Sequence, residues 1–272
     1  MGGQADRCRE FHELHQSGCF IIPNPWDLGS ARALVHLGFR ALATTSAGLA
    51  WSLGRRDHGV LLEEKLTHLR SMSEGIDVPL NADFEGGFAV EPAAVAANVA
   101  AAAATGIAGL SIEDSTGNPS SPLFDLGLAV ERVRAARDAI DRSGTGVLLT
   151  GRSEGFLVGR PDITETVRRL TAYAEVGADC LYAPGLRATA DIKAVVDALA
   201  PRPVNVLVGN DSVTVARLAQ LGVRRISVGG GLSRAARTGF LKAATEIAEQ
   251  GTFAGLGRAA AFADINGLFG SR

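Results

Sequence analysis

The sequence is poor in several features that define whole classes of protein. Its 272 residues include only three cysteines, Cys8, Cys19 and Cys180. Their odd number and wide spacing give no disulfide framework and no paired-cysteine metal motif. Aromatic residues make up 6% of the chain, and the formal net charge is −2. With few rings to stack on bases and no excess of positive charge, the chain is not expected to bind nucleic acid.

Long hydrophobic runs are missing as well. The apolar stretches, such as residues 95–104, are interrupted by polar residues and fall well short of the roughly 20 residues that span a membrane. The opening residues MGGQADRCREFHELH lack the apolar centre of a secretory signal. We therefore expect no membrane association, and we place the protein in the cytoplasm.

Apolar residues are nevertheless abundant, at 46% of the chain, and they fall into a regular series of short runs. Each run ends in polar or turn-forming residues, as β-strands do. The predicted strands cover residues 20–22, 41–45, 78–82, 109–112, 147–150, 180–182, 204–208 and 226–228.

Segments with apolar residues three and four apart separate these runs, as in amphipathic helices. The predicted helices cover residues 28–37, 62–72, 92–104, 128–140, 163–176, 190–199, 212–221 and 233–248. Eight alternations of strand and helix predict an α/β fold of the (β/α)8 TIM-barrel type, with a doubly wound open sheet as the alternative. No linker divides the chain, so we expect a single domain over residues 1–272.

The tail, residues 257–272, carries one more apolar-periodic segment, which includes Phe262, Ile265 and Phe269. A complete barrel leaves no place for this helix within its own chain. We therefore expect a C-terminal helical extension that packs on a neighbouring subunit in a homo-oligomer.

Acidic residues gather where the predicted strands end, which is where barrel enzymes place their active sites. Asp83 and Glu85 follow the third strand, Glu113 follows the fourth, and Asp57 lies in the loop after the second. Each acid alone could cap a helix or face solvent. Together, oxygen ligands without a Cys or His cluster favour a hard cation, Mg²⁺ or Mn²⁺.

Other strand ends carry groups that could hold an anionic substrate. Ser46-Ala47-Gly48 ends the second strand, and small residues there let backbone N–H groups approach an anion. Arg152 follows the fifth strand and could bind a carboxylate or an enolate oxygen. Asn205, in the seventh strand, could bind a substrate oxygen. Each residue also has a structural alternative. Ser46-Ala47-Gly48 could form an ordinary turn, Arg152 could form an ion pair with the neighbouring acids, and Asn205 could be a buried amide bonded to the backbone.

Taken together, six segments resemble the isocitrate lyase/phosphoenolpyruvate mutase superfamily, over most of the chain from about Phe20 to Gly231. They are PNPWDLGSARAL, TTSAGLAWSLGRRD, LNADFEGGF, GLSIEDSTG, LLTGRSEGF and RRISVGGGLSRAA. The resemblance implies a barrel whose eighth helix is exchanged with a partner subunit, usually in a dimer of dimers and hence a homotetramer. It also implies a Mg²⁺-dependent enzyme that handles 2-oxo acids through an enolate.

The resemblance also implies roles for individual residues. Asp83 matches the principal metal ligand, and Glu85 and Glu113 match acids that hold the waters of the metal. The predicted catalytic residues are Arg152, Asp57 and Glu113, and the predicted substrate-binding residues are Ser46, Ala47, Gly48, Arg152 and Asn205.

Two departures from the superfamily pattern narrow the expected chemistry. The lyases carry a Lys-Lys-Cys-Gly-His loop after the fourth strand, but residues 115–122 read STGNPSSP, without lysine or cysteine. Asn118 matches an asparagine of the phosphonate-handling branch, whose lysine is absent. The sixth strand ends in Ala183-Pro184-Gly185, where lyases carry a glutamate and the mutase a histidine.

Three hypotheses remain open at this point. The leading one is a Mg²⁺-dependent lyase or decarboxylase that cleaves a carbon–carbon bond of a small 2-oxo or 2-hydroxy dicarboxylate. The second is a phosphonopyruvate-type carbon–phosphorus mutase or hydrolase. The third is a non-catalytic protein that binds an oxo acid.

Overall fold

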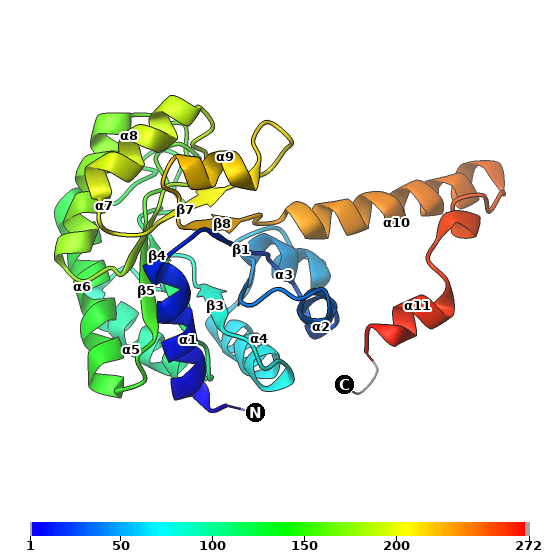
Figure 1. Ribbon diagram of the computed structural model, residues 1–272, viewed down its shortest axis with the longest axis horizontal. Helices are drawn as coiled ribbons and strands as arrows, with labels where there is room; N and C mark the ends of the chain where they lie inside the picture. The colour runs from blue at the N-terminus through cyan, green and yellow to red at the C-terminus, as the bar shows by residue number, and fades with distance from the viewer. Residues whose placement is uncertain (1, 270–272) are drawn as a thin grey trace.

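A computed structural model of the protein describes residues 2–269 and shows eight parallel strands in one sheet (Figure 1). The strands are β1 (Phe20–Ile22), β2 (Leu42–Ala43), β3 (Leu80–Asp83), β4 (Gly109–Glu113), β5 (Leu148–Arg152), β6 (Cys180–Tyr182), β7 (Val204–Leu207) and β8 (Arg225–Ser227). Their order is β1-β8-β7-β6-β5-β4-β3-β2. The first and last strands of the chain are therefore neighbours.

Pairing of β1 with β8 distinguishes a barrel from an open sheet. Ile21 stands opposite Ile226 in this parallel ladder. The remaining gap, between β1 and β2, is crossed by a backbone hydrogen bond from Ala43 N–H to the Pro23 carbonyl, at 3.1 Å. The Asn24 amide also donates to the Thr44 carbonyl, at 3.0 Å. The prediction of a (β/α)8 TIM barrel is confirmed, and the doubly wound alternative is wrong.

Helices precede, separate and follow the strands along the chain. They are α1 (Gln4–Gln16), α2 (Leu28–His36), α3 (Ser46–Ser52), α4 (Leu62–Gly75), α5 (Pro92–Ala103), α6 (Leu126–Ser143), α7 (Ile163–Glu175), α8 (Thr189–Leu199), α9 (Val215–Gln220), α10 (Gly231–Gln250) and α11 (Phe262–Gly267). Helix α3 was not expected. It begins at Ser46, because the Thr45 hydroxyl caps the Gly48 N–H and satisfies one of the free donors of its first turn.

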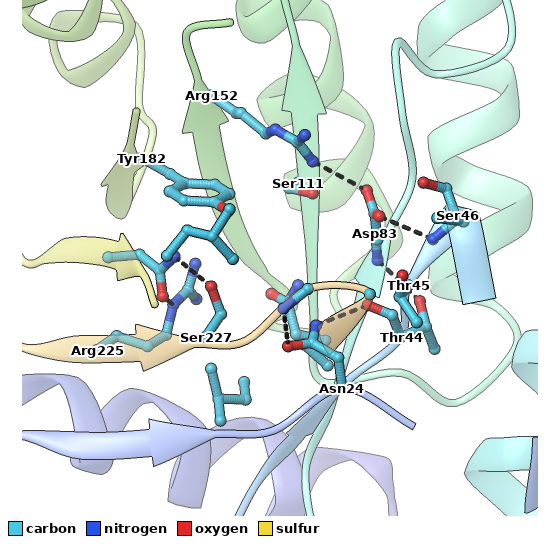
Figure 2. Close-up of a pocket in the computed structure, with 18 of the residues that line it drawn as sticks. Asn24, Thr44, Thr45, Ser46, Asp83, Ser111, Arg152, Tyr182, Arg225 and Ser227 are labelled. Carbon is cyan, nitrogen blue, oxygen red and sulfur yellow. Dashed lines mark hydrogen bonds and ion pairs between the residues drawn. The ribbon is translucent and has the colours of Figure 1, made fainter. Parts of the chain in front are cut away.

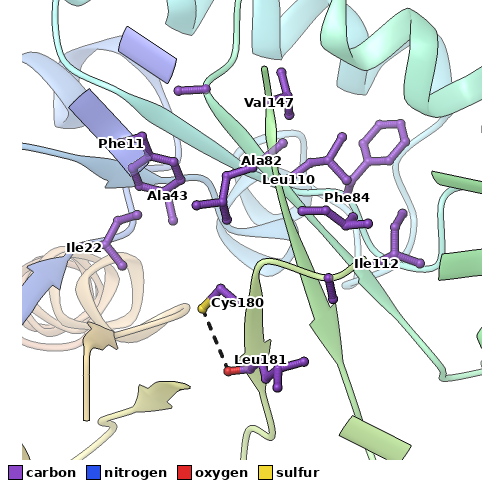
Figure 3. Packing of buried hydrophobic residues seen from close by; sticks show 14 of the residues in the cluster. Phe11, Ile22, Ala43, Ala82, Phe84, Leu110, Ile112, Val147, Cys180 and Leu181 are labelled. Atoms are coloured by element: carbon purple, nitrogen blue, oxygen red, sulfur yellow. Dashed lines mark hydrogen bonds between the residues drawn. The ribbon is translucent and has the colours of Figure 1, made fainter. Parts of the chain in front are cut away.

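Helix α1 fills the amino-terminal end of the barrel. Phe11 is fully buried among the apolar residues of the core (Figure 3). Its ring packs edge-on against His15 and Phe20. The ring lies so close to Gly109 of β4 that a Cβ there would come within 2.5 Å of a Phe11 ring carbon. This plug leaves the carboxyl ends of the strands as the place for a site.

Helices α10 and α11 form an arm that projects from the barrel (Figure 1). Of the α10 residues only Ser233 is buried, whereas Phe240 is 70% exposed and Phe262 of α11 is 82% exposed. The predicted tail helix thus exists, although residues 270–272 lie outside the described part of the chain. Within residues 2–269, no helix combines the length and apolar character needed to cross a membrane.

Candidate active site

Three of the predicted site residues are the last residues of consecutive strands. Asp83 ends β3, Glu113 ends β4 and Arg152 ends β5. Glu113 stands opposite Arg152 in the parallel ladder, and Asp83 stands opposite Ser111. Parallel pairing therefore brings the three side chains to one edge of the sheet, as the sequence predicted.

The Arg152 guanidinium lies between the carboxylates. Its Nη1 is 3.2 Å from Asp83 Oδ1 (Figure 2). The same Nη1 is 3.3 Å from Glu113 Oε2. Its Nε donates to Glu154, which the sequence analysis missed. The spacing G-R-S-E could have revealed it, because residues two apart in an extended segment project to the same side. Arg152 thus contacts the carboxyl groups of three acids.

Burial and these neighbours shift the protonation of the cluster. Burial alone would raise the pKa of Asp83, but Arg152, Lys65 and the Ser46 N–H together lower it. Burial raises the pKa of Glu113 to about 8, since Arg152 offsets only part of its desolvation. Arg152, surrounded by acids, has a pKa well above its ordinary value despite its burial. Without another cation, the cluster therefore keeps Asp83 ionised and Glu113 protonated near neutral pH.

Glu85 and His58 form a second pair at the rim. Glu85 Oε2 lies 3.0 Å from His58 Nδ1, and this hydrogen bond raises the pKa of His58 to about 9. Both residues have positive φ, 49° and 63°, a region that non-glycine residues rarely adopt. The other oxygen of Glu85, Oε1, is buried and has no hydrogen-bond partner among residues 2–269.

A cavity of about 180 Å³ opens beside the cluster. Its wall includes Asp83, Arg152, Ser46, Ala47, Asp57 and Asn205 from the predicted set, and Glu85, Glu113 and Gly48 lie outside it. Ser46 N–H donates to Asp83 Oδ2 at 2.9 Å, and Gly48 N–H donates to Thr45. In the described chain the Ala47 N–H has no hydrogen-bond partner, so one donor of the predicted cradle is free.

Asn205 lies deeper in the cavity wall and is already engaged. Its amide oxygen accepts from Arg225 and its amide nitrogen donates to Ser227, both at 2.9 Å. The structure therefore favours the alternative reading of Asn205, a buried amide satisfied by protein groups, with side chains rather than backbone as partners.

The site has the chemistry, but not the preassembled geometry, of a divalent-cation site. Among residues 2–269, no three His, Cys, Asp or Glu side chains converge closely enough to hold a metal ion, and Arg152 lies between Asp83 and Glu113. The donors are all carboxylate oxygens, and the buried Glu85 Oε1 lacks a partner. Three acids contact the Arg152 guanidinium and Glu85 lies at the rim beside His58, so acidic groups outnumber basic ones here, which suits a hard cation. The residue types fit Mg²⁺ once side chains rearrange.

Comparison with known proteins places the chain in a family. The family model for phosphoenolpyruvate phosphomutase matches residues 11–248. A crystal structure from Burkholderia cenocepacia, provisionally named a lyase/mutase, superposes with a TM-score of 0.95 at 44% identity, over 98% of this chain and 97% of that one. The chain belongs to the phosphoenolpyruvate phosphomutase family, within the isocitrate lyase/phosphoenolpyruvate mutase superfamily.

Two curated relatives show the range of this group. An uncharacterized protein of Mycobacterium tuberculosis is 34% identical over 221 residues, 80% of this chain and 81% of the relative. An oxaloacetate decarboxylase of Pseudomonas aeruginosa is 29% identical over 219 residues, 78% of this chain and 74% of that enzyme. The superfamily is thus one of lyases and mutases.

Proposed function

We propose that this protein is a Mg²⁺-dependent lyase or decarboxylase that cleaves a carbon–carbon bond of a small 2-oxo or 2-hydroxy dicarboxylate. The observation that carries the proposal is the cluster of Asp83, Glu113 and Arg152 beside a closed-ended cavity of about 180 Å³. The similarity to an oxaloacetate decarboxylase supports the same reaction class.

The metal would be held at the acid cluster. Asp83 is the principal candidate ligand, with Glu85 and Glu113 holding its waters, as the family resemblance implies; Mn²⁺ suits the same oxygens. Bound there, the ion would supply Lewis-acid polarisation of the 2-oxo group.

The residues of the chain would bind and orient the acid. The free Ala47 N–H can donate to a substrate carboxylate, and Arg152 can donate to an oxygen that gains negative charge during cleavage. A substrate that fills the small cavity would displace water, which would strengthen both contacts. In decarboxylation the bond to the distal carboxylate breaks, CO₂ leaves, and the electron pair remains as an enolate. A proton then adds to that carbon. Asp57, on the cavity wall, and Glu113 are the acids positioned near this chemistry.

Carbon–phosphorus chemistry is the second candidate, because the matching family model is that of a phosphomutase. The loop after β4 gives it little support. It lacks lysine, and Asn118 is exposed, with its side-chain oxygen accepting from Ser120 N–H at 3.0 Å. Release of phosphate from phosphonopyruvate would favour this reaction.

We also propose that the protein works as a homo-oligomer in the cytoplasm, with the arm of one subunit packed on another. The support is the apolar surface of α10 and α11, which remains exposed to solvent in the single chain; in α10 only Ser233 is buried. A homotetramer built as a dimer of dimers, with the arm exchanged between subunits, agrees with the family resemblance.

The direct test of activity follows pyruvate formation from oxaloacetate, and cleavage products from a panel of 2-oxo and 2-hydroxy dicarboxylates. We expect turnover with Mg²⁺ or Mn²⁺, loss of turnover with EDTA, and recovery when the metal is restored. Asp83→Asn should lower the rate by about a hundredfold or more, because it removes charge from the metal site.

Asp197→Asn is the matched control, because Asp197 lies exposed on α8, away from the cavity, and forms an ion pair with Lys193. It should leave the rate unchanged. Tight oxalate binding without turnover of any acid would show an oxo-acid-binding protein instead, and metal-independent turnover would refute the proposed metal site.

A further inference from the structure

A second arginine lies deep in the same cavity. Arg225 of β8 is 3% exposed and belongs to the cavity wall together with Arg152, Asp83 and Asn205 (Figure 2). The register places it opposite Phe20 of β1 and Asn205 of β7, whereas Ser227, two residues on, stands level with Leu207 at the end of β7. Arg225 therefore lies one inward-facing layer below the strand ends.

The partners of Arg225 are all neutral. Its Nε donates to Asn205 Oδ1 at 2.9 Å and its Nη2 donates to Thr150 Oγ1 at 3.0 Å. Its Nη1 lies 3.3 Å from His15 Nε2. Burial lowers the pKa of His15 to about 3, with Arg225 contributing, so this imidazole is neutral and accepts. Among residues 2–269, no carboxylate forms an ion pair with Arg225.

The two arginines of the cavity therefore differ in charge balance. Within the described part of the chain, Arg152 contacts the carboxyl groups of three acids, whereas Arg225 contacts no acid. A buried charge without a counter-charge is costly, and proteins keep one where a ligand supplies the partner. A guanidinium has five N–H donors. Three are used by Asn205, Thr150 and His15, so two remain.

The position of this charge relative to the acid cluster indicates what it binds. The cluster and the Ala47 N–H occupy the mouth of the cavity, where the 2-oxo carboxylate end of a substrate would lie. Arg225 occupies the floor of the same cavity of about 180 Å³. A cavity of about 150 Å³ can hold a benzene-sized molecule, so this one has room for one small acid whose two ends face the two groups.

We propose that Arg225 binds the distal carboxylate of the substrate and so selects dicarboxylates over monocarboxylates. This inference rests on the proposed function for the orientation of the substrate. Asn205 is then a positioning residue, because its amide oxygen holds the Arg225 Nε and fixes the direction of the guanidinium.

The experiment compares two ligands that differ only in the distal carboxylate, malate and lactate. Their dissociation constants are measured by calorimetry with Mg²⁺ present, and oxalate serves as a probe of the mouth alone. We expect the wild-type protein to prefer malate over lactate. Arg225→Met should reduce that preference by about ten- to a hundredfold, because this is the contribution of a charge-assisted hydrogen bond to affinity. The dissociation constant of oxalate should change little.

Two further variants separate recognition from folding. Arg225→Lys keeps the charge and should retain part of the malate preference. Arg224→Met is the matched control, because the neighbouring Arg224 is half-buried on the outside of the barrel and donates to the Gly18 carbonyl. This variant should leave the dissociation constants of malate and lactate unchanged.

The binding readout keeps this inference distinct from the proposed reaction. A wild-type protein that prefers malate, and loses that preference in Arg225→Met, supports the role of Arg225 even if no acid is turned over. Equal binding of malate and lactate by the wild-type protein would overturn it. If both Arg225 variants weakened the binding of malate, lactate and oxalate equally, Arg225 would have a structural role and the proposal would also be overturned.

Discussion

Individual polar residues inside this barrel have pKa values that differ from their usual values in water. His15 on α1 is the clearest case outside the acid cluster. Its Nδ1 donates to the Phe11 carbonyl at 2.7 Å, and burial lowers its pKa to about 3. The unfolded chain would restore a pKa near 6.5. The protonated form therefore favours the unfolded state.

This difference predicts how acid affects stability. Between pH 6.5 and 3 the unfolded state binds a proton at His15 that the folded state refuses, so stability falls as pH decreases through this window. His15 should account for about 2 kcal/mol of destabilisation at pH 5. Denaturant titrations at several pH values should show a shallower loss in His15→Gln than in the wild-type protein. Parallel pH curves for the two proteins would contradict the assignment.

The sequence could predict some site residues and not others, for reasons of geometry. Asp83, Glu113 and Arg152 were predictable, because each directly ends an apolar run and parallel strands bring their ends together. Arg225 was not predictable, because it lies within the pair Arg224-Arg225. Which of two adjacent arginines faces the interior depends on strand register, which a short strand does not reveal.

At the scale of the elements, α1 and β4 fit together with no spare space. Gly109 is required where β4 passes the Phe11 ring, since an added Cβ would lie 2.5 Å from that ring and 2.7 Å from Asn81 Oδ1. Gly109→Ala should destabilise the protein by about 1–3 kcal/mol, the usual cost of overpacking a core. The midpoint of thermal or denaturant unfolding measures this change.

Gly127 provides the matched control for this substitution. It lies exposed in the first turn of α6 and a Cβ there would meet nothing within 4 Å. Gly127→Ala should raise stability by up to about 1 kcal/mol, because alanine loses less backbone entropy in a helix. If both variants shifted the midpoint in the same direction, the tight packing of α1 on β4 would be refuted.

The elements themselves were largely predictable, because strand and helix periodicities alternate cleanly along the chain. Helix α3 was missed, since Ser46-Ala47-Gly48 has the composition of a turn and the helix depends on the Thr45 cap. Helix α9 was predicted from residue 212 but begins at Val215, after the turn in which Asn210 accepts from Ser212. Local hydrogen bonds by short polar side chains decided both cases.

At the scale of the whole molecule, the arm is the feature whose apolar surface a single chain leaves exposed to solvent. Phe240, Phe253 and Phe262 are each more than 60% exposed on it. Removal of the residues after Gly257, or the substitution Phe240→Glu, should lower the molecular mass of the assembly measured by light scattering, because each removes apolar surface from the expected contact.

Leu37→Glu is the control for the added charge. Leu37 is 68% exposed at the end of α2, on the barrel rather than the arm. This variant should keep the mass of the wild-type assembly. An unchanged mass for the truncated chain and for Phe240→Glu would refute the role of the arm in assembly.

The plug formed by α1 also determines how small molecules enter and leave the barrel. Because Phe11 and His15 seal the amino-terminal end, a molecule that enters between the strand ends must leave the way it came. A chamber of about 180 Å³ does not let two small acids pass each other. Product must therefore leave before the next substrate can enter, and a product that dissociates slowly would block the entrance of the cavity.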